Sequence, residues 1–301
     1  SGVGGGGGAA GGGGLFGGAG GGSGGGGGAV LDSGPGGSVA VTCPAVAAKP
    51  TDGQKTVMVD GTTSRTYYLH VPAAYNGTKP APLLLDFHGL GGTGQGEEQS
   101  SPYPPVIDPD GVVSAYPDGS SGSQGTGWNL GPCCTSTDDV AFARALVQDV
   151  EKQACIDPTR VYAVGYSLGG GMVHVLACQA ADVFAAASPA AADLEKDNVA
   201  TCKPARPITL VDFRGTADPD VPYAGGTIAS LVNIGAVATF QDWAQFDQCT
   251  GSPSASDSNG CSTYSSCAAG VQVTLCTKQG GGHDPGNATV SWPILQKYTL
   301  P

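Results

Sequence analysis

The feature that most constrains this chain is the stretch VYAVGYSLGGGM, residues 161–172, in which Ser167 follows an apolar run and stands between two glycines. Residues 168–182 continue with the apolar content of a buried helix. A strand, a tight turn and a helix in this order are typical of the G-x-S-x-G turn, which exposes a serine nucleophile above a sheet. Side chains at Gly165 or Gly169 would clash with the backbone that closes around the serine. The stretch therefore predicts an α/β domain with Ser167 as its nucleophile.

Glycine is so abundant that a glycine motif needs support from its surroundings, because 52 of the 301 residues are glycine. The excess is concentrated in residues 1–28, which are almost wholly glycine. Such a segment cannot bury enough apolar surface to offset the entropy lost on ordering. We therefore expect residues 1–36 to form a disordered tail or linker and residues 37–301 to form one catalytic domain.

Short apolar runs alternate with helical patterns along this domain. A hairpin is predicted at 55–72, and buried strands at 81–89, 111–119, 160–167, 207–215 and 271–279. Helices are predicted at 137–154, with Thr137 or Asp138 as the cap, and at 168–182, 238–247 and 290–298. This alternation predicts a mostly parallel central sheet with helices on both faces.

Charge and cysteine content limit the partners of the chain. The net charge is −12 and the basic residues are scattered, which argues against nucleic acid. No apolar stretch approaches the roughly 20 residues of a membrane span. The ten cysteines form no CxxC pair and no Cys/His cluster at zinc spacing, so we expect disulfides and no metal. These features favour an exported monomer, secreted or anchored to the cell surface through a lipid. Local disulfides are expected between Cys178 and Cys202, and two among Cys249, Cys261, Cys267 and Cys276.

A serine nucleophile needs a base, and the chain has only four histidines. His70 falls within a strand, His174 lies two helical turns beyond Ser167, and His88 opens HGLGG after a strand, where it would brace the loop. All three are expected to be structural. His283, in the loop QGGGHDPG after the strand at 271–279, is the predicted base.

The acid that orients this base should follow another strand. The segment LVDFRGTADPDVPY offers Asp212, Asp218 and Asp220. Asp212 falls inside the strand, whereas Asp218 stands on the turn after it, so we predict that Asp218 accepts the Nδ1 proton of His283. Asp220 is the alternative.

An oxyanion hole and an acyl pocket complete the expected site. The loop HGLGG lets the backbone approach the substrate, and the N–H groups of Leu90 and Leu168 are the predicted oxyanion donors. Three aromatic residues are candidates for the acyl pocket, with core packing as an equal alternative: Trp128, Tyr166 and Trp243.

Taken in order, HGLGG, YPDG, Trp128, CC with DDVAFARALV, DPTRVYAVGYSLGGGM, GTADPDVPY and GGGH resemble the secreted esterase family of polyhydroxybutyrate depolymerase-like enzymes and feruloyl esterases. The resemblance covers about residues 43 to 295. It implies an α/β-hydrolase fold, a Ser167–Asp218–His283 triad, and ester hydrolysis without a metal or organic cofactor. Members of the family attack cinnamoyl esters of plant cell-wall polysaccharide, acetyl groups on xylan, or hydroxyalkanoate polyesters.

Two positions depart from the pattern of that family. Members often have His before the GTxD turn, where this chain has Phe213-Arg214, and Thr-Trp after the catalytic histidine, where it has Asp284-Pro285. No binding module for solid polymer is evident. We therefore expect a feruloyl esterase-type hydrolase; a polyester depolymerase or acetylxylan esterase is the alternative, and a non-catalytic surface protein a distant one.

Overall fold

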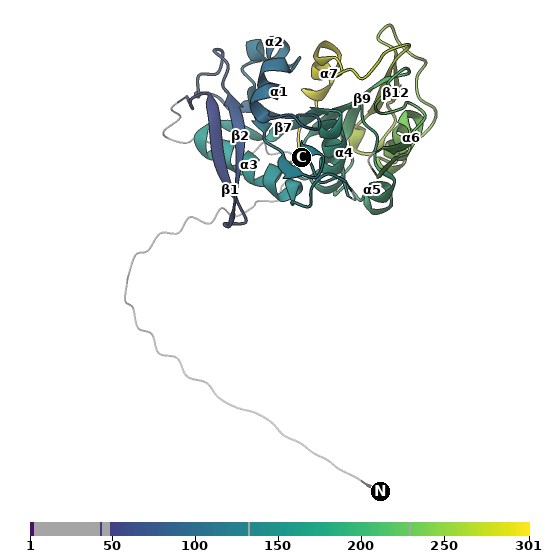
Figure 1. Cartoon of the computed structure of the whole chain (residues 1–301), viewed down its shortest axis with the longest axis horizontal. Coiled ribbons are helices and arrows are strands. Elements are labelled where there is room, and N and C mark those ends of the chain that lie inside the picture. The colour runs from purple at the N-terminus through teal and green to yellow at the C-terminus, as the bar shows by residue number, and fades with distance from the viewer. Residues whose placement is uncertain (3–42, 44–48, 132, 229) are drawn as a thin grey trace, which may run out of the picture. The chain divides into compact units, whose positions relative to one another are not determined.

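The computed structural model describes residues 1–2, 43, 49–131, 133–228 and 230–301 (Figure 1). The predicted tail, residues 1–36, lies outside the described residues except for its first two positions. The strands and helices below belong to residues 49–301.

One mixed sheet runs through the domain (Figure 1). Its strands are β1 (Gly53–Val59), β2 (Thr63–His70), β3 (Ala81–Phe87), β4 (Val113–Pro117), β7 (Ile156–Tyr166), β8 (Ala186–Ala190), β9 (Thr209–Gly215), β12 (Cys261–Tyr264) and β13 (Val273–Lys278). They lie in the order β1-β2-β4-β3-β7-β8-β9-β13-β12. The six strands from β4 to β13 run parallel, and β1, β2 and β12 pair antiparallel at the two edges. The predicted, mostly parallel sheet is confirmed.

Helices connect the parallel strands. They are α1 (Gly94–Ser100), α2 (Pro104–Ile107), α3 (Asp139–Gln153), α4 (Leu168–Gln179), α5 (Lys196–Thr201), α6 (Ala236–Phe246) and α7 (Ala288–Leu295), with short 3-10 turns η1 (Asp108–Asp110) and η2 (Ala268–Gly270). Within the described part of the chain, none of them combines the length and apolarity needed to cross a bilayer.

Two apolar cores form on opposite faces of the sheet, because successive side chains of a strand point to opposite sides. Leu83 and Leu85 of β3 belong to one core, together with buried residues of α3, α4 and α6. Leu84 belongs to the other core, with residues of α2 and α7. Every residue of β3 is buried, as expected for a central strand covered on both faces. The prediction of helices on both faces is confirmed.

In helix α3 the sequence specifies both the start of the helix and its buried face. The carboxylate of Asp138 accepts the N–H of Ala141 at 2.8 Å, so Asp138, one of the two candidates, is the cap. Phe142, Leu146 and Val150 recur every four residues and are all fully buried. Their spacing places them on one face of the helix, toward the sheet.

Two small hairpins were not expected from the sequence. β5 (Ser120–Gly122) pairs with β6 (Gly125–Gly127), and β10 (Gly226–Ile228) pairs with β11 (Leu231–Asn233). Each strand has only three residues, and three of the four contain glycine, so no apolar alternation marks them. Both hairpins follow carboxyl ends of sheet strands and contribute to the site described below.

All ten cysteines are paired. The bridges Cys178–Cys202, Cys249–Cys267 and Cys261–Cys276 agree with the predicted local pairings, so disulfide stabilisation is confirmed. Two further bridges were not predicted: Cys43–Cys155 and the adjacent pair Cys133–Cys134.

The sheet order decides where the functional loops meet. β3, β7, β8, β9 and β13 are consecutive neighbours and parallel, so their carboxyl ends lie along one edge. Loops that follow such ends form the ligand site in open α/β sheets. The loop after β3 carries Leu90, and the turn after β7 carries Ser167; the loops after β9 and β13 carry Asp218 and His283.

Candidate active site

Ser167 forms the turn between β7 and α4. Its backbone has φ 57° and ψ −125°, a combination that residues with a side chain rarely adopt. The N–H of Ser167 donates to the carbonyl of Ala190 at 2.9 Å, and the N–H of Gly171 donates to the carbonyl of Ser167 at 3.0 Å. The neighbouring strand and the following helix therefore hold the strained turn in place.

The glycines two positions before and after Ser167 leave no room for a side chain. A Cβ atom at Gly169 would clash with the carbonyl oxygen of Phe87, and one at Gly165 would lie 2.7 Å from the carbonyl oxygen of Gly169. The end of β3 crowds Gly169, and the first turn of α4 crowds Gly165. These two glycines are thus required by packing.

The imidazole of His283 bridges the serine and a carboxylate. Its Nε2 lies 2.8 Å from Oγ of Ser167, and its Nδ1 lies 2.8 Å from Oδ2 of Asp218. The hydroxyl of Tyr166 donates to the backbone carbonyl of His283 at 3.0 Å, and the two rings lie 4.9 Å apart between centroids. Tyr166 therefore tethers the loop that carries the imidazole.

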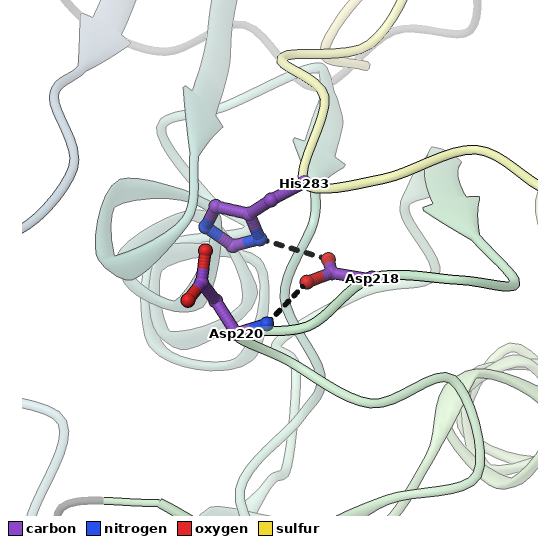
Figure 2. Close-up of side chains that lie close together, drawn as sticks. All are labelled: Asp218, Asp220 and His283. Atoms are coloured by element: carbon purple, nitrogen blue, oxygen red, sulfur yellow. Dashed lines mark hydrogen bonds and ion pairs between the residues drawn. The ribbon is translucent and has the colours of Figure 1, made fainter.

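The buried carboxylate of Asp218 is held by three donors. Oδ2 faces His283, while Oδ1 accepts the backbone N–H groups of Asp220 at 2.8 Å and Val221 at 2.9 Å (Figure 2). Asp220 is exposed, and among the described residues its carboxylate makes no hydrogen bond with the imidazole. Asp212 lies inside β9, where burial raises the pKa of its carboxyl well above the usual range. Of the three candidate acids, the structure joins only Asp218 to His283.

Side chains of Asp218, Asp220 and His283 also form the one group of potential metal ligands in the described residues. Their ligand atoms lie within 4.8 Å of one another (Figure 2). Both oxygens of Asp218 and the Nδ1 of His283 are already engaged in the hydrogen bonds given above. Hydrogen bonding therefore accounts for the contact between Asp218 and His283.

Leu90 lies in the loop after β3, and Leu168 directly follows the serine at the start of α4. A Cβ atom at Gly89 would lie 3.3 Å from the Cβ of Ser167, so the loop after β3 runs directly beside the nucleophile. Leu168 is the first residue of α4, where the N–H has no partner within the helix. Among the described residues, neither backbone amide donates to a protein acceptor. Both residues line the same cavity as Ser167, which leaves their N–H groups available to an oxyanion.

His88 and Trp128 brace the loop that carries Leu90. Nε2 of His88 accepts the N–H of Gly119 at 2.9 Å, and Nδ1 lies 2.7 Å from the carbonyl of Gly89. The indole N–H of Trp128 donates to the carbonyl of His88 at 2.8 Å. His88 therefore has the bracing position predicted from the sequence.

Comparison with known proteins places the chain in a family. No protein-family model matches it. It is 41% identical over 246 residues to feruloyl esterase B of Piromyces equi, an alignment that covers 79% of this chain and 46% of that protein. It is 31% identical over 272 residues to the Nocardia uniformis protein NocK, named as an esterase, with 82% of this chain and 75% of that protein covered. The chain belongs to the feruloyl esterase B/C-like family of esterases.

A solved structure shares the fold of this chain. An acetyl xylan esterase from Aspergillus awamori superposes with a TM-score of 0.59 at 18% identity, covering 81% of this chain and 98% of that one. Similarity at this level concerns the fold, which is the predicted α/β-hydrolase fold. The chain spans about half the length of the Piromyces relative, 46% of it.

A cavity of about 450 Å³ lies beside Ser167. Of the three aromatic candidates, only Tyr166 lines it. Trp128 is fully buried and meets Phe87 edge to face, with ring centroids 5.1 Å apart. Trp243 is 1% exposed and donates from its indole to Nδ1 of His174 at 3.0 Å. Trp128 and Trp243 are therefore core residues, in agreement with the alternative that the sequence left open.

Several cavity residues were missed by sequence reasoning. They include Leu130, Cys133, Cys134, Asp193, Glu195, Leu231 and Asn233. They come from irregular segments or from the short strand β11, where no periodic pattern predicts a position. The adjacent cysteines were visible as a motif, but nothing in their spacing located them at the cavity.

The two departures from the family pattern have separate structural roles. Arg214 is buried and forms an ion pair with Asp193 beside the cavity. Asp284 forms an exposed ion pair with Lys278 at 2.9 Å. The carboxylate next to His283 in sequence is therefore directed to a lysine, and the imidazole keeps Asp218 as its partner.

The remaining histidines do not face the cavity. His70 pairs with Asp108 on the surface side of β2 at 3.0 Å. His174 is fully buried in α4, where burial, reinforced by the nearby Arg214 cation, lowers its pKa to about 3. The neutral ring accepts the hydrogen bond of Trp243.

This buried histidine makes stability depend on pH. Between the folded pKa of about 3 and the unfolded value of 6.5, only the unfolded chain takes up the proton, so stability is lost as pH falls below 6.5. For a fully buried group, the loss reaches about 2 kcal/mol at pH 5. We expect His174→Asn, which retains an acceptor for Trp243, to remove this part of the pH dependence. Urea unfolding of the unchanged protein and of His174→Asn at pH 7 and pH 5 measures the free energy of unfolding. An equal loss of stability in the two proteins between these pH values would contradict the role given to His174.

Proposed function

We propose that this chain is a serine carboxylic-ester hydrolase in which Ser167 is the nucleophile, His283 the general base and Asp218 the acid that orients it. The observation that carries the proposal is the unbroken series of hydrogen bonds from Ser167 through His283 to Asp218, 2.8 Å at both steps. A serine hydroxyl is a weak nucleophile, and this arrangement activates it. The series opens into a cavity that also presents two free backbone amides.

The reaction proceeds in two acyl-transfer steps. Oγ of Ser167 attacks the ester carbonyl while Nε2 of His283 takes the hydroxyl proton. The C–O bond to the alcohol then breaks, the alcohol leaves with that proton, and the acyl group remains on Ser167. Water attacks the acyl-enzyme in the same way, giving its proton to Nε2, and the acid leaves as Ser167 regains a proton.

Two groups stabilise the charges that develop. The N–H groups of Leu90 and Leu168 donate to the oxyanion of each tetrahedral intermediate, and removal of one such donor typically costs about 3 kcal/mol in the barrier. Asp218 accepts the Nδ1 proton, which fixes the tautomer that leaves Nε2 free to act as a base, and its charge stabilises the imidazolium. The positive end of α4 lies beside Leu168 and acts in the same direction.

We propose hydroxycinnamoyl esters of plant cell-wall polysaccharide as the substrates. Membership of the feruloyl esterase B/C-like family supports this class. The cavity volume of about 450 Å³ is in the range of small-molecule sites, and leucines and a disulfide form part of its wall. Five disulfides support an exported enzyme.

Parallel assays of methyl ferulate and p-nitrophenyl butyrate test the substrate class. We expect kcat/KM for methyl ferulate to equal or exceed that for the butyrate ester at neutral pH. The p-nitrophenolate that leaves from the butyrate ester is a far better leaving group than the methoxide of methyl ferulate. Comparable turnover of the ferulate therefore requires recognition of its acyl group. Turnover of the butyrate alone would instead indicate a short-acyl or polyester hydrolase. Turnover of neither would favour a non-catalytic protein.

A further inference from the structure

The cavity beside Ser167 has two walls, which are formed by loops that follow strands on either side of β7. β3 and β4 lie on one side of β7, and β8 and β9 lie on the other. The wall formed after β3 and β4 includes Leu90, Leu130 and the Cys133–Cys134 disulfide. The wall formed after β8 and β9 contains four residues with carboxyl or amide groups: Asp193, Glu195, Asp220 and Asn233. The two walls therefore offer different chemistry to a substrate.

Asp193 is already committed to the protein. Its carboxylate forms an ion pair with Arg214 in which both side chains are fully buried. Its Oδ2 also accepts the N–H of Gly235 at 2.9 Å. This carboxylate therefore fixes the wall to β9 and α6 and is not free to bind a ligand.

Glu195 is also buried, but it has no cationic partner among the described residues. It is 5% exposed, and among the described residues no lysine or arginine forms an ion pair with its carboxyl. Burial raises its pKa to about 7, an effect that the nearby Asp197 reinforces and the N–H of Val232 opposes. A buried carboxyl costs free energy unless its hydrogen bonds are satisfied, and the open side of this one is the cavity.

Asn233 lies beside Glu195 on the same wall. The two residues form an isolated antiparallel bridge between the segment before α5 and β11. Asn233 is 8% exposed and lines the same cavity. A buried carboxyl, bonded to one backbone N–H and paired with no described lysine or arginine, and a buried amide thus line one cavity with Ser167.

We propose that Glu195 and Asn233 form a subsite that binds a hydroxyl group of the ester substrate. The inference rests on the proposed function, because it names a substrate feature recognised beside the same nucleophile. The carboxylate accepts from the hydroxyl, and the amide N–H donates to its oxygen, so one hydroxyl satisfies both groups. A hydrogen bond of a hydroxyl to a carboxylate is stronger than one between neutral groups.

The surrounding charges favour a hydroxyl over an anionic ligand. Asp220 on the same wall is exposed and would repel an anion. Arg214, which lies behind this wall, is neutralised by Asp193, and no lysine or arginine is among the described residues that line the cavity. Such a hydroxyl comes either from the phenol of the acyl group or from the sugar of the alcohol, and both sources present the same chemistry.

Two substrate pairs distinguish these sources. Methyl ferulate against its phenol O-methylated analogue isolates the phenolic hydroxyl, and a feruloylated arabinose against methyl ferulate isolates the sugar hydroxyls. We expect Glu195→Leu to reduce the kcat/KM preference for the hydroxyl-bearing member of one pair by about 10- to 100-fold. Glu195→Gln, which keeps an acceptor of the same shape, should restore most of that preference.

Glu151→Leu is the matched control, because Glu151 is a half-buried glutamate on α3 outside the cavity. It should leave both ratios as in the unchanged protein. If Glu195→Leu remains active on methyl ferulate yet changes neither ratio by more than about twofold, the subsite is refuted while the proposed hydrolase activity stands. Absence of turnover in the unchanged protein would refute the proposed function itself.

Discussion

Ser167→Ala is expected to lower kcat/KM for ester hydrolysis by roughly 10⁶-fold, to the level that binding and the oxyanion donors alone sustain. The reason is that no second nucleophile lies within hydrogen-bonding distance of Nε2 of His283 among the described residues. Without Oγ, His283 can only assist direct attack by water. The measurement is initial-rate kinetics on whichever of the two assayed esters the unchanged protein hydrolyses faster.

A serine in the adjacent strand provides the control. Ser188 is buried in β8, and its hydroxyl donates to the carbonyl of Val211 at 2.7 Å, away from the cavity. Ser188→Ala removes one buried hydrogen bond and should reduce stability by about 1 kcal/mol while leaving kcat within a few-fold. A fluorophosphonate probe should label the unchanged protein and Ser188→Ala but not Ser167→Ala. Labelling that persists in Ser167→Ala would identify another nucleophile.

The catalytic candidates could be predicted because each stands where a buried strand ends. Ser167, Asp218 and His283 follow β7, β9 and β13, and those strands are recognisable as short apolar runs. Parallel strands bring such ends to one edge of the sheet. To predict that Ser167, Asp218 and His283 lie together, only the strand assignment and the residue types were needed. The register of the sheet was not needed.

The polar wall of the cavity could not be predicted, because its residues do not stand at the ends of recognisable buried strands. Glu195 and Asn233 belong to a segment without periodicity and to a three-residue strand, so neither has a pattern that indicates burial. Their proximity depends on how the loop after β8 folds against the β10–β11 hairpin. That contact is tertiary, and local sequence preferences carry no information about it.

The aromatic residues illustrate a further limit. Trp128 and Trp243 each have an indole N–H that needs a buried partner, and each finds one in the core, at the carbonyl of His88 and at His174. From the sequence alone, a tryptophan is equally suited to a pocket or to a core. The choice is decided by where its acceptor lies, which is known only from the structure.

Asp218→Asn is expected to lower kcat by roughly 10⁴-fold with little change in stability. The side chain keeps its shape, and its carbonyl oxygen can still accept the N–H groups of Asp220 and Val221. The amide nitrogen then faces Nδ1 of His283 and donates to it, which places the imidazole proton on Nε2. In that tautomer Nε2 cannot accept the proton of Ser167. Steady-state kinetics with thermal unfolding of the same preparations measures both effects.

Asp220→Asn separates this effect from a general loss of negative charge. The two carboxylates lie close together and both flank the imidazole (Figure 2), but only Asp218 is hydrogen-bonded to it. If the hydrogen bond is what matters, Asp220→Asn should retain activity within about tenfold, because a carboxylate without that bond contributes only through-space stabilisation of the imidazolium. Comparable losses in the two variants would mean that the summed charge near His283 drives the proton transfer. A larger loss for Asp220→Asn would assign the orienting role to Asp220.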